Sequence, residues 1–142
     1  MQRAAQIIDA ALSLTLAVFC LFLLSQPAAA QNVKVELPFT SARSLLLVSV
    51  MVDGTPRTLI FDIGAERTLI HSTGQSVEHR ATVILPGKTL SNFPLILSDL
   101  TDLQIAKAGA DGVLGEDIIG KFDCVGIDYA RKVITLESHG AR

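Results

Sequence analysis

The sequence is poor in the residues on which several classes of protein depend. It has no Trp, a single Tyr and only 5% aromatic residues, so we expect no aromatic surface for stacking on sugars or bases. Two cysteines are too few for a disulfide scaffold. The 12 Lys and Arg residues form no basic stripe and are outnumbered by 14 Asp and Glu, so nucleic acid is not an expected partner. A hydrophobic content of 49% excludes an intrinsically disordered chain.

Motifs for metal, phosphate and serine-hydrolase chemistry are also missing. The three histidines, His71, His79 and His139, lack the spacing of a metal-binding pair. The acidic residues between positions 111 and 123 are too irregular for a calcium loop, whose ligands alternate. There is no Gly-x-Ser-x-Gly motif and no glycine-rich phosphate loop. We therefore expect no metal and no other cofactor.

Residues 1–30 have the features of a secretory signal peptide. Arg3 gives a positive start, and the apolar run from Ala10 to Leu24 is shorter than the roughly 20 residues of a membrane-spanning helix. Pro27 then precedes three alanines that suit signal peptidase. The sequence therefore predicts a secreted or periplasmic protein that begins at Gln31. An uncleaved N-terminal membrane anchor is the alternative, because Asp9 is unusual in a signal peptide.

Cleavage after residue 30 would leave a small domain with one cysteine. Cys124 then has no partner for a disulfide within the chain, and its apolar neighbours predict a place in the core. A domain of this size is marginally stable alone, which favours oligomerisation. We expect residues 31–44 to form an N-terminal extension, 45–137 a single domain and 138–142 a tail.

Short strands separated by turns dominate the expected domain. Asp53-Gly54, a strong hairpin signal, joins an apolar run over 45–52 to a second run over 58–61. Further strands are expected over 68–70, 82–85 and 93–97, a short helix over 118–122, and a closing hairpin from 124–129 and 133–136. The fold class is therefore all-β, as a compact barrel or sandwich.

A first candidate for chemistry lies in the segment Phe61-Asp62-Ile63-Gly64-Ala65. Apolar residues lead directly into Asp62, and Gly64 permits a tight turn after it. A carboxyl group at the end of a buried strand is expected to be desolvated, which favours its protonated form near neutral pH. The structural alternative is that Asp62 only initiates a turn.

A second candidate segment is Gly112-Val113-Leu114-Gly115-Glu116-Asp117. Two apolar residues between glycines predict a buried strand that crosses close to another backbone. The alternative is an ordinary turn from a strand into a helix, with Asp117 near the helix cap.

Together these segments resemble the retropepsin-like aspartic proteases, including secreted bacterial members. The resemblance spans the Asp-Gly hairpin at 52–55, the Asp-x-Gly-Ala segment within 59–70, the Gly-x-x-Gly segment at 112–119 and the closing hairpin at 122–136. It implies a small closed β-barrel with one short helix near the C-terminus, and an aspartic-type endopeptidase that hydrolyses a peptide or protein substrate. It also implies Asp62 as the catalytic residue. The residues that would support the active loop are Ile63, Gly64, Ala65, Gly112, Gly115 and Asp117.

Aspartic proteolysis needs two carboxyl groups that share one proton, one acting on a water molecule and the other on the peptide carbonyl. This chain has one Asp-x-Gly motif of the required kind. A second Asp62 is therefore expected from another copy, in a two-fold symmetric homodimer. A membrane would be a partner only if the N-terminal segment stays uncleaved.

Two departures from the family pattern favour an alternative function. Ile63 stands where the family has Thr or Ser, whose hydroxyl braces the active loops across the dimer. Only residues 71–80 separate two expected strands where the family folds a flap over the substrate, and placing the flap tip at 86–88 leaves too few residues for the next strand. The alternative is a catalytically inactive relative that serves as a dimerising or peptide-binding module.

Overall fold

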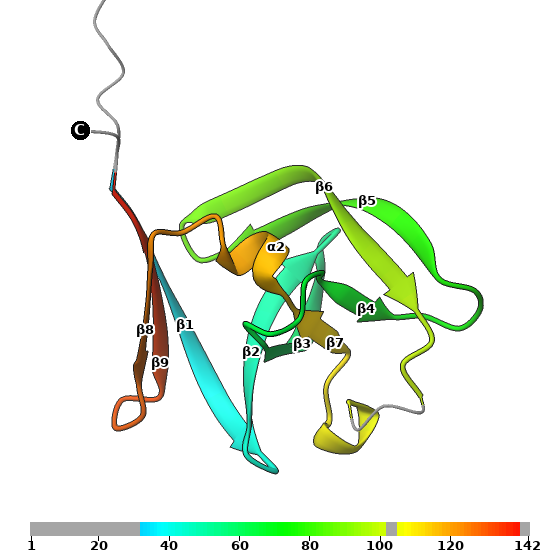
Figure 1. Ribbon diagram of the computed structural model, residues 1–142, viewed down its shortest axis with the longest axis horizontal. Coiled ribbons are helices and arrows are strands. Elements are labelled where there is room, and N and C mark those ends of the chain that lie inside the picture. Colours follow the sequence, from blue (N-terminus) through cyan, green and yellow to red (C-terminus); the bar gives the residue numbers. More distant parts are fainter. Residues whose placement is uncertain (1–31, 102–104, 140–142) are drawn as a thin grey trace, which may run out of the picture. The chain divides into compact units, whose positions relative to one another are not determined.

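The computed structural model describes residues 32–101 and 105–139, so the expected signal peptide lies outside the described residues. The described part is built almost entirely from strands (Figure 1). In chain order these are β1 (Val33–Ala42), β2 (Leu45–Val52), β3 (Thr55–Phe61), β4 (Leu69–His71), β5 (Val77–Leu85), β6 (Lys88–Ser98), β7 (Gly112–Leu114), β8 (Cys124–Asp128) and β9 (Val133–Ser138). A 3-10 turn, η1 (Ala106–Ala108), precedes β7, and a short helix, α2 (Glu116–Ile119), follows it.

Six of these strands close into a barrel. The sheet order is β3-β7-β4-β6-β5-β2, and the pairing of β3 with β2 joins the two ends. The pairs β3–β7 and β4–β6 are parallel, whereas the other pairs are antiparallel. Closure pairs the two ends of this six-stranded part of the sheet with each other. The expected fold class, a small closed all-β barrel with a short helix near the C-terminus, is confirmed.

Strand β1 connects the barrel to a three-stranded extension. Its second half pairs with β2, its first half pairs with β9, and β8 pairs with the far side of β9 (Figure 1). Apolar and polar residues alternate along β1, so Val35, Leu37 and Phe39 are buried while their neighbours face solvent. No strand was expected in this segment, although the alternation of apolar and polar residues along it is typical of a strand.

The core fills the barrel and continues under α2. Ile118 and Ile119 of α2 pack with Leu59 of β3 and Leu114 of β7, and β9 adds Leu136 to the same cluster. Burial of these side chains is the main force that holds the short helix on the barrel, because a four-residue helix has little stability alone.

The expected elements are present, with shifted boundaries. The strand over 45–52 and its Asp53-Gly54 turn are found as expected, whereas β5 and β6 extend well beyond 82–85 and 93–97. The helix begins two residues before the expected 118. Cys124 is exposed on β8, so its expected place in the core was wrong. Among the residues described, no helix is long and apolar enough to cross a membrane.

Candidate active site

Asp62 lies immediately after β3, at the start of a tight loop. Its backbone N–H donates to the carbonyl of Leu114 in β7 at 3.1 Å, which fixes where the loop begins. The Gly64 N–H donates to Asp62 Oδ1 at 2.8 Å, and the Ala65 N–H donates to the Asp62 carbonyl at 3.3 Å. The loop thus folds back on the carboxylate and holds one of its oxygens, while Asp62 itself is exposed in the single chain. Desolvation of this group was expected, and the single chain does not provide it.

The Gly-x-x-Gly segment passes close beside this loop. A Cβ atom on Gly112 would lie 2.0 Å from the carbonyl oxygen of Leu69, and one on Gly115 would lie 2.6 Å from the carbonyl of Arg67. Real Cβ atoms do not approach backbone so closely, so only glycine fits at these two positions. The Glu116 N–H donates to the Ala65 carbonyl at 2.7 Å and joins the start of α2 to the loop.

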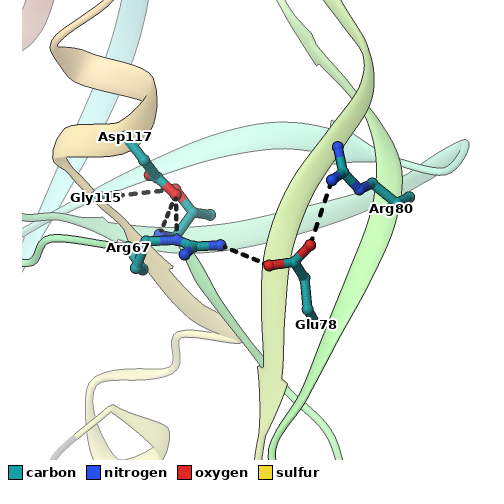
Figure 2. A network of polar contacts seen from close by, with 6 residues as sticks. Arg67, Glu78, Arg80, Gly115 and Asp117 are labelled. Carbon is teal, nitrogen blue, oxygen red and sulfur yellow. Dashed lines mark hydrogen bonds and ion pairs between the residues drawn. The ribbon is translucent and has the colours of Figure 1, made fainter.

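A buried polar network locks the loop to α2 (Figure 2). Thr68 Oγ1 donates to Asp117 Oδ1 at 2.6 Å, and the Thr68 N–H donates to Asp117 Oδ2 at 2.9 Å. The Gly115 N–H in turn donates to Thr68 Oγ1 at 3.1 Å. Thr68 is 1% exposed, so these bonds are made away from water, where a lost partner is costly. Asp117 therefore braces the loop, and its side chain does not cap α2.

Sequence reasoning missed Thr68 as a member of this network. Its partner Asp117 lies 49 residues away, and nothing local distinguishes this threonine from others in strands. The network continues outward from Asp117 through Arg67 to Glu78 and Arg80 (Figure 2). The pairs made by Glu78 are solvent-exposed and contribute little to stability.

A groove of about 620 Å³ opens at Asp62. One side is formed by Phe61, Asp62 and Ile63, and the other by residues of α2 and β8. Three of its apolar side chains are unusually exposed: Ile63 at 66%, Val125 at 38% and Ile127 at 40%. Exposed apolar side chains around a carboxylate are typical of a surface that binds a partner or ligand.

Ile63 is not a core residue in the single chain. Its side chain is largely exposed and lines the groove beside Asp62, so it contributes little to packing within the chain. Ala65 is partly buried and packs against a second apolar cluster around Leu47 and Val113. Gly64 lies so close to Asp62 that a Cβ atom there would be 3.2 Å from Oδ1.

Among the described residues, no hairpin tip lines this groove. Five residues, 72–76, connect β4 to β5, and β5 then pairs directly with β6. The tip of the β5–β6 hairpin packs beside the barrel, since β5 pairs with β2 and Gly87 lies near the Lys34 carbonyl. Neither the 72–76 connection nor the hairpin tip lines the groove at Asp62. The placement of a flap tip at 86–88 is therefore not supported.

Comparison with known proteins supports the fold at the level of structure. No protein-family model matches the sequence, and a search of curated proteins finds no match. Among solved structures, the chain is similar to a retropepsin-like aspartic protease from Rickettsia conorii, with a TM-score of 0.53 and 14% sequence identity. The match covers 79% of this chain and 95% of that protein. At this identity the likeness establishes a retropepsin-like fold.

Proposed function

We propose that this protein is a retropepsin-like aspartic endopeptidase that acts as a homodimer, with one Asp62 from each chain. The observation that carries the proposal is the Asp62 loop. A carboxylate stands at the end of a barrel strand, one of its oxygens is held by the Gly64 N–H, and the loop is locked to α2 through Thr68 and Asp117. The retropepsin-like fold supports the same function.

The chemistry requires two such loops facing each other. Two carboxyl groups at close range cannot both ionise, so they share one proton. The ionised Asp62 takes a proton from a bound water molecule, whose oxygen attacks the peptide carbonyl. The protonated Asp62 of the other copy donates its proton to the carbonyl oxygen, and a tetrahedral intermediate forms. The carbon–nitrogen bond then breaks, the leaving nitrogen takes the proton that the first Asp62 received from water, and a hydroxyl of the intermediate returns a proton to the Asp62 of the other copy.

The second copy is expected to cover the groove and β8. Among the described strands, β8 is the last in the sheet order and pairs only with β9, so its other edge is open. An open edge flanked by exposed Val125 and Ile127 suits antiparallel pairing with the same strand of another copy. Covering this surface would also remove Asp62 from bulk water.

The proposal also includes where in or outside the cell the protein acts. The features of residues 1–30 support export to the periplasm or the medium, followed by cleavage before Gln31. If the segment stays uncleaved, the domain would instead be held at a membrane.

The test is hydrolysis of a mixed peptide library between pH 4 and 7. Wild-type protein should produce fragments, and Asp62→Asn should produce none. Asp99→Asn is the matched control, because Asp99 is an exposed carboxylate outside the groove. Equal cleavage by wild type and Asp62→Asn would exclude the proposal.

A second function is favoured by two observations: the missing hydroxyl at Ile63 and the short connection over 72–76. The site then remains open to water, and the protein would be a catalytically inactive module that dimerises or binds peptides. A dimer that binds library peptides but leaves them intact, with wild type and Asp62→Asn alike, would establish this function instead.

A further inference from the structure

A second, smaller pocket lies beside the turn between β2 and β3. Its volume is about 240 Å³, and it shares no lining residue with the groove at Asp62. Three of its lining side chains are apolar. The polar ones come from β3, β4, β5 and the adjoining turns and are Asp53, Thr55, Arg57, His71, Ser72 and His79.

Arg57, a half-buried residue of this pocket, has one unsatisfied nitrogen. Its Nε is fully buried and has no hydrogen-bond partner, and no ion pair is found for Arg57 among residues 32–101 and 105–139. Arginine does not lose its proton in proteins, so the group cannot become neutral to avoid this cost. A buried, unpaired donor on a cation is rare, and a bound anion in the pocket would supply its partner.

Asp53 is the one carboxylate that lines the pocket, and it is already engaged with other residues. Asp53 Oδ1 accepts the Thr82 N–H at 2.8 Å, and Oδ2 lies 3.0 Å from His79 Nε2. These two interactions, the Thr82 bond first, hold the pKa of Asp53 below its usual range, so it stays ionised and paired. Asp53 therefore does not serve as the partner of Arg57.

The other polar residues of the pocket supply hydrogen-bond donors. His71 Nδ1 accepts the Leu100 N–H at 3.1 Å, so in the neutral ring the hydrogen is on Nε2. Ser72 and Thr55 add hydroxyl groups. Asp111 does not line the pocket, and its Oδ2 accepts the Thr58 N–H at 2.8 Å. A guanidinium, an imidazole N–H and hydroxyls together form a donor set for an anion.

We propose that this pocket binds a small oxyanion, a phosphate or carboxylate group, with Arg57 as its main contact. The pocket is smaller than the roughly 300–1,000 Å³ of drug-sized ligand sites, so it accommodates one such group and excludes a peptide. The planar guanidinium fork matches the geometry of both oxyanions. This site is independent of the proposed peptidase activity.

The test is a titration of the protein, as recovered from the expressing cell, with inorganic phosphate and separately with acetate. Sodium chloride keeps the ionic strength constant. Binding is followed by calorimetry and by the NMR signals of Thr55, His71 and Ser72. At least one anion should bind saturably and shift these signals, and Arg57→Gln should weaken binding about tenfold or more. The two titrations show which oxyanion the pocket prefers.

Arg43→Gln is the matched control. Arg43 is exposed in the β1–β2 turn, so this substitution removes the same charge outside the pocket. It should bind as wild type does. Unchanged binding in Arg57→Gln, the absence of saturable binding by either anion, or shifts confined to residues near Arg67 and Arg80, outside this pocket, would each overturn the proposal. If Arg57→Gln fails to fold, the wild-type shift map decides the question alone.

Discussion

Ile63 is 66% exposed in the single chain, next to Asp62. In the proposed homodimer, we expect the missing hydroxyl at this position to limit how firmly the two Asp62 loops hold each other. Ile63→Thr should raise Asp62-dependent peptide cleavage by about one order of magnitude, because small errors in placing catalytic groups are costly. Ile63→Val is the matched control, since valine has the shape of threonine without its hydroxyl. Equal rates for the Thr and Val variants would show that the hydroxyl is not the limiting feature.

Gly115 is required by a close backbone approach. A Cβ atom there would lie 2.6 Å from the Arg67 carbonyl and 2.8 Å from that of Ala65. Any larger residue at this position would therefore push the Asp62 loop away. Gly115→Ala should lower the free energy of unfolding by about 2–3 kcal/mol, as measured by urea denaturation. Gly126→Ala serves as control, because its nearest neighbour would be 4.0 Å away, and it should change stability by less than about 0.5 kcal/mol.

Asp53 links the β2–β3 turn to β5 in an acid-sensitive way. The Thr82 N–H and then His79 lower the pKa of Asp53 below its ordinary value of 3.8. Because the pKa of Asp53 is lower in the folded than in the unfolded chain, its ionised form stabilises the fold above the unfolded-state pKa. That stability is lost as the pH falls through the folded-state pKa. Thermal midpoints of wild type should therefore fall between about pH 4 and pH 2 more steeply than those of Asp53→Asn. Identical slopes would contradict this role.

At the scale of elements, the Thr68–Asp117 network holds the Asp62 loop on α2. Thr68→Val keeps the shape but leaves Asp117 Oδ1 and the Gly115 N–H without their partner, which should cost about 1–3 kcal/mol of unfolding free energy. Glu78→Gln is the contrast, because its ion pairs are exposed and should contribute under about 1 kcal/mol. If urea denaturation shows the same loss of unfolding free energy in Thr68→Val and Glu78→Gln, the network does not brace the loop.

The strands were predictable from the sequence where turn residues and apolar runs coincide. The Asp53-Gly54 hairpin carries both signals, whereas the closing hairpin was predicted from its two apolar runs, and the strands of both were found. The first half of β5 was missed because Glu78, His79 and Arg80 are exposed there, so the segment has no apolar pattern. The Thr68–Asp117 contact was beyond sequence reasoning, because only the barrel closure brings these residues together.

At the scale of the whole molecule, the proposed site needs two copies. Light scattering at tens of micromolar should report a homodimer, since one chain offers one Asp62 and exposes an apolar groove and the β8 edge. Ile127→Lys should shift the equilibrium toward monomer by placing a charge on that surface, while Ile84→Lys, on an equally exposed side chain of β5, should not. Monomer in the wild type would argue against a preformed site.

The N-terminal segment gives a separate prediction about export. Protein recovered from the periplasm or the medium should begin at Gln31, because small residues precede that position. N-terminal sequencing gives the answer directly. An intact Met1 on protein recovered with membranes would establish the anchor instead.

The most direct test of the central claim, that each of two copies supplies one catalytic Asp62, is a subunit-mixing titration. Wild-type and Asp62→Asn chains are mixed at constant total concentration, allowed to exchange, and assayed for peptide cleavage. If both carboxyl groups are required, activity follows the square of the wild-type fraction, so an equal mixture retains about one quarter of the full rate. A linear dependence, with about half the rate retained, or no cleavage by wild type alone, would contradict the account.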